Sequence, residues 1–231
     1  SYNIHHGCDI HEKLQLDQIA ALVRKDRADI VALVEVDSVC TRSGRTDQPA
    51  ILSKLTGMHV AYVRHFAFEG GAYGLALLSR FPITRVTNER IPVMTDENGD
   101  STRALLSAHL SLPGGKGLDV LVAHLDYRSG ESRARQADFL DRLLQGKQGP
   151  LMMLGDLNAA PGSGPIQHLE TRFTDANNAG DKTFPSDAPR EKIDYILIDK
   201  AHFGKTLRDT VYPVQYSDHR PIAADLTLSG S

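Results

Sequence analysis

The sequence predicts an α/β fold in which two packed β-sheets carry helices on their outer faces. Apolar runs typical of strands outnumber the segments with helical spacing. Neighbouring strand candidates are joined in some places by short turns and in others by a helix, so hairpins and crossovers are mixed. An all-parallel doubly wound sheet would need a helix after nearly every strand. No repeat or linker divides the chain, so we expect a single domain over residues 1–231.

The composition is that of an ordinary soluble globular protein, with 41% hydrophobic and 24% charged residues. A net charge of −3 argues against a whole-surface electrostatic grip on nucleic acid but leaves a local basic groove open. No apolar run could span a bilayer, so we expect no stable membrane insertion, and we expect a monomer. Ser1 falls almost inside the first strand, which indicates a trimmed N-terminus. Bacterial cytoplasm and a secreted or periplasmic location both stay open.

The first half of the chain alternates strands and short helices. A short strand ends within residues 2–6, and residues 14–23 have the apolar spacing of an amphipathic helix. Residues 29–36 form an apolar, β-branched strand, and residues 48–56 predict a helix that Gly57 ends. Further strands are expected at residues 59–65, 73–79, 102–112 and 118–125. Asn98-Gly99 and Gly114-Gly115 are turn signals, and the second suits a hairpin.

The second half is arranged around the stretch from Pro150 to Pro161. Its apolar run continues to Gly155, as in a strand buried on both faces, and ends in Asp156 and Asn158. These two are two residues apart, so on an extended backbone they point to the same side. Residues 129–144 form the clearest helix, with an apolar side at Ala134, Ala137, Leu140 and Leu144. A short helix at Gly164-Pro165 and three strands at residues 193–198, 207–214 and 221–228 complete the chain.

Several apolar strands end on a residue that chemistry could use. These residues are Asn3, Glu35, His124, Asp126, Asp156, Asn158, Asp194, Asp218 and His219. Each has an ordinary interpretation as a turn residue, a helix cap, a core histidine or an ion-pair partner, although a Glu is almost never fully buried unless it is paired. Together they indicate one site. Converging carboxylates repel one another, so we expect a hard divalent cation, Mg²⁺ or Mn²⁺, among them.

The same residues lie in motifs whose order and spacing are specific. The motifs are Tyr2-Asn-Ile4, Ala32-Leu-Val-Glu-Val36, Tyr73-Gly-Leu-Ala-Leu-Leu-Ser-Arg80, Val122-Ala-His-Leu125, Gly155-Asp-Leu-Asn158, Ile193-Asp-Tyr195 and Ser217-Asp-His219. Over essentially the whole chain this set resembles the endonuclease/exonuclease/phosphatase family. That family includes pancreatic-type deoxyribonucleases, abasic-site endonucleases, inositol-polyphosphate 5-phosphatases and bacterial sphingomyelinases. The chain resembles a small, bacterial-type member, which implies a four-layer α/β/β/α sandwich.

The resemblance implies a metal site. Glu35 corresponds to the main metal-binding carboxylate, and Asn3 and Asp218 to further residues of the metal site, directly or through water. The position before the Glu is often Gln in the family, whereas here it is Val34. A hydrogen bond that supports the metal ligand would then be absent.

The resemblance also implies acid–base roles. Asp156 would position or deprotonate the attacking water, and Asn158 would orient water or a phosphate oxygen. Asp194 would hold His219, which would contact the scissile phosphate or share the base role. His124 would assist the leaving oxygen. These assignments predict a metal-dependent phosphodiesterase or nuclease, with a phosphomonoesterase or a lipid-headgroup (inositol-phosphate or sphingomyelin type) phosphodiesterase as the alternative. A non-catalytic binding domain is the third class, and it would need a broken set of polar residues.

Substrate contacts are less well defined by the sequence. Arg42 and Arg45 follow Glu35 on a predicted loop, and arginine forks suit phosphate oxygens, so both are candidate substrate-binding residues. A solvated loop is the alternative. The absence of Trp argues mildly against a membrane-surface substrate.

The two cysteines are the remaining chemical feature of the sequence. Cys8 and Cys40 each follow a strand-end residue, Asn3 and Glu35, by five positions. If the two strands are neighbours, the thiols are close enough for a disulfide, although we favour two free thiols.

Overall fold

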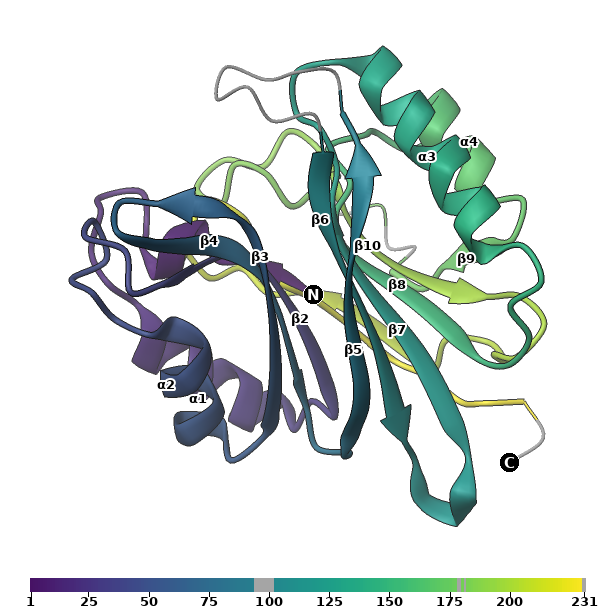
Figure 1. Ribbon diagram of the computed structural model, residues 1–231, viewed down its shortest axis with the longest axis horizontal. Coiled ribbons are helices and arrows are strands. Elements are labelled where there is room, and N and C mark those ends of the chain that lie inside the picture. Colours follow the sequence, from purple (N-terminus) through teal and green to yellow (C-terminus); the bar gives the residue numbers. More distant parts are fainter. Residues whose placement is uncertain (94–101, 178–179, 181, 230–231) are drawn as a thin grey trace.

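The computed structural model describes residues 1–93, 102–177, 180 and 182–229, and its strands form two mixed sheets (Figure 1). The first sheet has the order β1 (Tyr2–Asn3), β2 (Ile30–Ser38), β4 (Gly71–Ser79), β3 (His59–Phe68). The second has the order β5 (Ile83–Pro92), β6 (Thr102–Ser111), β7 (Gly117–His124), β8 (Leu151–Asp156), β10 (Asp194–Asp199), β9 (Phe173–Asp175). The strands β11 (Arg208–Val211) and β12 (Ile222–Asp225) form a separate two-stranded ribbon.

Helices cover the outer face of each sheet, and Figure 1 shows them on opposite sides of the molecule. The helices α1 (Leu16–Asp26) and α2 (Gln48–Thr56) pack on the first sheet, and α3 (Gly130–Leu144) and α4 (Gly164–Leu169) pack on the second. Two short 3₁₀ turns, η1 (His5–Gly7) and η2 (Pro113–Gly115), follow β1 and β6. The four-layer α/β/β/α sandwich expected from the sequence is confirmed.

Three apolar clusters hold the layers together. The cluster between the sheets includes Val34, Leu77, Leu106, Val122 and Leu154. The neighbours of these residues along the strands, such as Leu33, Leu121 and Met153, belong to the clusters under the helices. Burial on both faces explains why β2, β7 and β8 are nearly continuous apolar runs rather than alternating ones.

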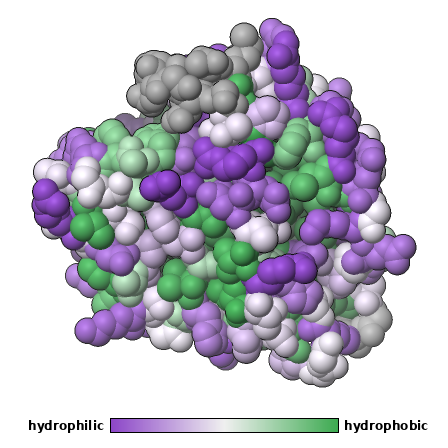
Figure 2. Space-filling view, viewed as in Figure 1, coloured by the Kyte–Doolittle hydropathy of each residue, from purple (hydrophilic) through white to green (hydrophobic). Residues whose placement is uncertain are grey.

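The strands that the sequence did not predict lie at the edges of the second sheet. Half of the side chains of β5 are exposed and only one is buried, and its sequence lacks apolar alternation. Figure 2 shows hydrophilic and hydrophobic residues interspersed on the face of the molecule that carries β5. The three-residue β9 was also not predicted. Edge strands with one solvated face give little apolar signal, so pattern reading misses them.

The structure also corrects details of the predicted helices. Ala134 is exposed, and Gln136 is buried on that helix instead, where its Oε1 accepts a hydrogen bond from the Asp126 N–H. Leu14 is exposed and precedes α1, whose buried face starts at Leu16. The Asn98-Gly99 turn lies outside the described residues.

Turn and cap signals agree well with the structure. Gly57 ends α2 in the left-handed conformation, at φ 70°, and Asp47 caps its start. Ser129 caps α3. The antiparallel pair β6–β7 is joined through Gly114-Gly115, as predicted. Within the described residues, no helix is long and apolar enough to cross a membrane.

Cys8 and Cys40 are free thiols, and both are buried. Strands β1 and β2, which precede them, are parallel neighbours, as the disulfide alternative required. The Cys40 thiol lies 3.3 Å from the Ala72 carbonyl oxygen, so it already has a backbone acceptor. The preference for two free thiols is therefore confirmed.

Candidate functional site

The register of the second sheet places three polar residues in a row at one edge. Parallel pairing sets His124 of β7 opposite Asp156 of β8, and antiparallel pairing sets Asp194 of β10 opposite Asp156 from the other side. All three are almost fully buried. Residues from three separate parts of the chain therefore meet because their strands end or begin at the same level.

The strand β8 can reach this position because of Gly155. Its φ is 141°, and a Cβ there would lie 1.9 Å from the Ala123 carbonyl oxygen, so any side chain would push β8 away from β7. The strand ends at Asp156, and the chain then turns. Asn158 has φ 48°, and its N–H donates to Asp156 Oδ1 at 2.9 Å. The expectation that Asp156 and Asn158 share one side of an extended strand is therefore wrong, because the second residue closes a turn onto the first.

The first sheet contributes Asn3 and Glu35. Strand β1 pairs with β2 so that Asn3 lies opposite Val34, beside Glu35. The register of β2 against β4 skips Glu35, which has φ 61°, as at a β-bulge. A bulge re-aims one side chain of a strand, and this one lets Glu35 leave the core while Val34 and Val36 remain buried. A carboxylate carried on a strained backbone is typical of a functional residue.

The Asn3 side chain joins the two sheets. Its Nδ2 donates to Glu35 Oε1 at 3.0 Å and to Asp156 Oδ2 at 3.1 Å, and it lies 3.4 Å from His219 Nε2. The Asn3 Oδ1 accepts the N–H of His5 at 3.1 Å, which fixes the orientation of the amide. The predicted side chains of both sheets are thus brought together around one amide group.

His219 comes from the loop before β12. Its Nδ1 is 2.9 Å from Asp194 Oδ2 and its Nε2 is 3.6 Å from Asp156 Oδ2. The Ser217 hydroxyl accepts the His219 N–H and donates to the Asn3 carbonyl, so the loop is tied to β1. The Phe184 ring packs against the imidazole at 4.8 Å between centroids. These contacts together fix the orientation of the imidazole.

Burial and charge set the protonation of this cluster. Burial is the largest influence on Asp156 and raises its pKa to about 7, against the opposing effect of His219. Burial also opposes a charge on His219, but Asp194 and Asp156 outweigh it and raise the pKa of His219 to about 10. A carboxyl group that titrates near neutrality beside a charged imidazole is typical of an acid–base centre.

The second histidine lies in a different setting. His124 Nε2 is 3.7 Å from Asp156 Oδ2, while burial, followed by Arg103 and His65, lowers the pKa of His124 well below its usual value. Its Nδ1 is buried and has no hydrogen-bond partner among the described residues. The Asp156 carboxylate thus lies between a charged and a neutral imidazole.

Other predicted site residues lie outside this cluster. Asp218 is half-buried, and its carboxylate lies 3.1 Å from the Ser217 hydroxyl. Arg42 binds the buried Asp37 through two hydrogen bonds of 2.8 Å and stacks over Phe68, while Arg45 is exposed. Because Arg42 is already paired, its fork is not free in this arrangement. The roles predicted for these residues stay predictions.

Sequence reasoning missed the group of polar residues beside His124. Arg103 is buried and lies 3.6 Å from Asp126, and the half-buried Tyr73 has a pKa raised well above its usual value by desolvation and by the nearby Glu35. His65 packs edge-on against Tyr73 at 6.0 Å. A lone Arg at the start of an apolar strand was a usable signal, of the same kind as Glu35, because a buried charge needs a partner.

The donor set suits a divalent cation. Ligand atoms of Asp156, Asp194 and His219 all lie within 4.8 Å of one another, and the Asp194 Oδ1 is buried with no hydrogen-bond partner among the described residues. The half-buried Glu35 adds a third carboxylate within reach of Asn3. Three carboxylates beside one imidazolium leave negative charge that a cation can balance. The carboxylates of this cluster could therefore hold a metal ion, with the imidazolium of His219 beside the ion and not bound to it.

The chain is similar to known proteins in sequence and in fold. The chain is 27% identical over 247 residues to the uncharacterized protein YbhP of Escherichia coli (strain K12), covering 98% of this chain and 94% of that protein. A functionally unknown conserved protein from Enterococcus faecalis V583 has a similar structure, with a TM-score of 0.81 and 18% identity over 99% of this chain and 98% of that one. The Bacteroides thetaiotaomicron VPI-5482 mannosyl-6-phosphatase Bt3783 gives a TM-score of 0.76 and 17% identity, covering 92% of this chain and 90% of that one.

A family model provides the assignment. The model described as the Endonuclease/Exonuclease/phosphatase family matches residues 1–219, which include every strand-end residue of the site. The match supports hydrolysis of phosphate esters as the general class of activity. The chain belongs to the Endonuclease/Exonuclease/phosphatase family.

Proposed function

We propose that this protein is a metal-dependent phosphodiesterase, with nucleic acid as one class of substrate. The observation that carries the proposal is the approach of two histidines to one carboxylate oxygen. His219 Nε2 and His124 Nε2 lie 3.6 and 3.7 Å from Asp156 Oδ2. Such a group can take a proton from water on one side of a phosphorus atom and assist the departing oxygen on the other.

Asp156 takes the role of the base. Its pKa near 7 suits proton transfer at neutral pH, and the Asn158 N–H holds one carboxylate oxygen so that the other faces the histidines. Water would give its proton to Asp156 as its oxygen attacks the phosphorus. His219, flanked by two carboxylates, would carry positive charge and bind a phosphate oxygen, and Asp194 would hold its ring.

His124 takes the role next to the leaving group. Burial and the neighbouring Arg103 favour the neutral imidazole, so it would bind through a hydrogen bond rather than through charge. This division follows from the surroundings of the two rings, since both approach the same carboxylate.

Glu35, with Asn3 and Asp218, is the proposed metal-binding group. Mg²⁺ or Mn²⁺ bound there would offset the negative charge of the phosphate and stabilise the leaving oxygen. The half-buried Glu35 would leave room for the waters that Mg²⁺ retains. The exposed Arg45 remains a proposed contact to the rest of the substrate, and Arg42 would join it only by releasing Asp37.

A matched pair of esters tests the proposal. Bis-p-nitrophenyl phosphate and p-nitrophenyl phosphate release the same product from a diester and a monoester, so their rates compare substrate class directly. We expect hydrolysis of the diester with Mg²⁺ or Mn²⁺ and none with EDTA. Plasmid DNA, RNA, inositol phosphates and sphingomyelin extend the panel. A preference for the monoester or for a lipid headgroup would favour the alternative hydrolases.

A control variant makes the same change of charge at a position away from the site. Asp156→Asn should abolish most of the turnover, whereas Asp138→Asn, at an exposed position on α3, should leave it unchanged. No hydrolysis of any ester under any metal by the wild-type protein would favour a non-catalytic binding domain.

A further inference from the structure

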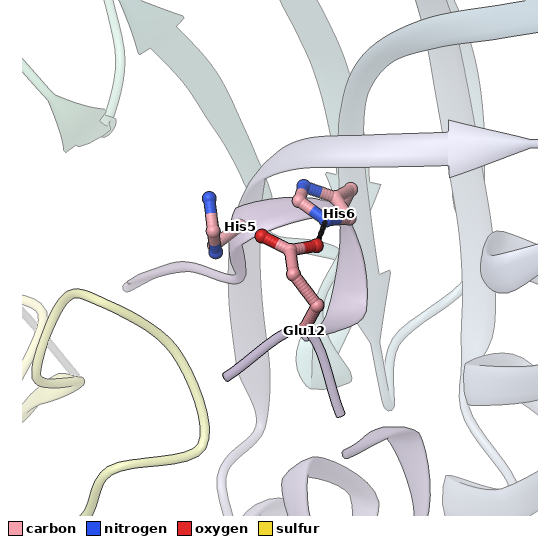
Figure 3. A group of neighbouring side chains, drawn as sticks. All are labelled: His5, His6 and Glu12. Carbon is pink, nitrogen blue, oxygen red and sulfur yellow. Dashed lines mark hydrogen bonds and ion pairs between the residues drawn. The ribbon is translucent and has the colours of Figure 1, made fainter. Parts of the chain in front are cut away.

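Three side chains that the proposed reaction does not use form a second cluster next to the site. His5 and His6 belong to η1, and Glu12 belongs to the loop before α1. Each offers one ligand atom, and these atoms lie within 4.8 Å of one another. Figure 3 shows the Glu12 carboxylate between the two imidazole rings.

The loop that carries Glu12 is held firmly. Asp9 Oδ1 accepts the N–H groups of His11 and Lys13, and Asp9 Oδ2 accepts Gln15 Nε2 at 2.6 Å. An isolated antiparallel β-bridge between the backbones of Cys8 and Leu14 closes the loop. The backbone of the loop is thus fixed beside the histidines, and the Glu12 side chain extends from it to His6.

The ion pair between Glu12 and His6 satisfies only part of the hydrogen-bonding capacity of the cluster. Glu12 Oε2 lies 2.9 Å from His6 Nε2, and this hydrogen bond is the main reason that the pKa of Glu12 is lowered. The Nδ1 of His5 is shielded from solvent and has no hydrogen bond among the described residues. All three residues also have positive φ, of 45°, 45° and 59°, which is uncommon outside glycine.

We propose that His5, His6 and Glu12 form a binding site for a borderline divalent transition-metal ion such as Zn²⁺, separate from the hard-cation site at Glu35. Two imidazoles and one carboxylate are a common set for zinc when a further position is left to water. Imidazole nitrogen suits zinc, copper and nickel, whereas Mg²⁺ prefers oxygen alone. The donor types therefore separate the two sites by metal.

The cluster is connected to the family site through the backbone. The His5 N–H donates to Asn3 Oδ1, and Asn3 in turn contacts Glu35 and Asp156. A metal ion bound to the His5 ring would immobilise the segment that orients the Asn3 amide. A ligand that binds only the folded state also stabilises it, so Zn²⁺ should raise the Tm in a concentration-dependent way.

Calorimetric titration with Zn²⁺ in saturating Mg²⁺ tests the proposal. We expect the wild-type protein to bind Zn²⁺ and Glu12→Gln or His5→Asn to weaken binding by at least about tenfold. Asn tolerates the positive φ of His5, and Glu12 is exposed, so both variants should fold. His11→Asn, in the same loop but outside the cluster, is the matched control and should bind as the wild type does.

A second set of measurements separates this site from the family site. Asp156→Asn should keep the Zn²⁺ binding that Glu12→Gln loses. In NMR spectra, Zn²⁺ should shift the ring signals of His5 and His6 before those of His219. Loss of Zn²⁺ binding in Asp156→Asn with none in Glu12→Gln would overturn the proposal, and so would unchanged affinity in both Glu12→Gln and His5→Asn.

Discussion

The two histidines on either side of Asp156 are alike in burial but differ in charge, since one ring is charged and the other neutral. His219 and His124 are each 5% exposed, and their Nε2 atoms lie at nearly the same distance from one carboxylate oxygen. His219 has Asp194 at 2.9 Å behind its ring, whereas His124 has Arg103 and His65 nearby. The pKa is raised in the first and lowered in the second.

The difference teaches that the neighbours of a buried imidazole, and not burial itself, decide its charge. Burial disfavours the imidazolium in both cases, and only a carboxylate at hydrogen-bonding distance reverses the outcome. In the proposed reaction this gives one ring that binds anionic oxygen and one that acts as a neutral donor or acceptor. The following variants break or sharpen this contrast, from the largest expected effect to the smallest.

Asp156→Asn removes the group that the two histidines share. Without the proposed base, and with less negative charge to hold His219 as a cation, we expect turnover of a phosphodiester to fall by about 1,000-fold. The measurement is kcat on bis-p-nitrophenyl phosphate with Mg²⁺. A circular dichroism melt should show a folded protein. Turnover within about threefold of the wild type would remove Asp156 from the chemistry.

His219→Ala removes the charged ring and leaves Asp156 and Asp194 without a cation between them. We expect a loss of about 100-fold in kcat, because electrostatic stabilisation of the phosphate oxygen is lost while the base remains. The matched variant His124→Ala should lose clearly less. Equal losses in the two variants would contradict the division of roles.

The strand-end pattern was enough to predict much of this site from the sequence. Glu35, Asp156 and Asp194 interrupt apolar runs, and a buried charge without local partners must find distant ones. Each strand end was identifiable and together they indicated one site, whereas the individual roles came from the resemblance to a known family. The two-sheet arrangement followed from the number of apolar strands.

Other features depended on three-dimensional context. The bulge at Glu35 and the turn at Asn158 both require positive φ in residues other than glycine, which no local pattern indicates. The charge on His219 depends on Asp194, and the neutral state of His124 depends in part on Arg103. Both partners are remote in the chain and become neighbours only through the pairing of strands and the packing of loops.

Asp194→Asn sharpens the contrast by removing the cause of the charge on His219. In protein stripped of divalent cations with EDTA, NMR titration should show the pKa of His219 falling from about 10 towards that of a free imidazole. We expect about a tenfold loss of kcat at neutral pH, because the ring keeps its place through Phe184 and Ser217.

The same variant should change stability at alkaline pH. The folded-state pKa of His219 lies above its unfolded value of 6.5, so its contribution is fully present below 6.5 and is lost as pH rises through about 10. The metal-free wild-type protein should therefore lose Tm between about pH 7 and 10, and Asp194→Asn should lose less. Parallel Tm curves for the two proteins would show that Asp194 does not hold a charge on His219.

His124→Gln tests the neutral histidine of the pair and should have the smallest effect. His124 is neutral in the folded protein, and the nitrophenyl leaving group needs little assistance. We therefore expect kcat on the nitrophenyl diester to fall by only about tenfold or less. Its folded-state pKa is depressed below 6.5, so its contribution to stability is present above 6.5 and is lost as pH falls below that value. The metal-free variant should therefore keep its Tm better than the wild type as the pH is lowered from about 6.5 to 5.

The comparison of the two Tm curves isolates His124 from its neighbour. Asp156, with its raised pKa, makes the folded state more stable as the pH falls in both proteins, so the difference between the two curves, and not either curve alone, reports on His124. A difference that grows as pH rises instead of as it falls would mean that His124 is charged in the folded state. The contrast with His219 would then disappear, and with it the reason for giving the two rings different roles.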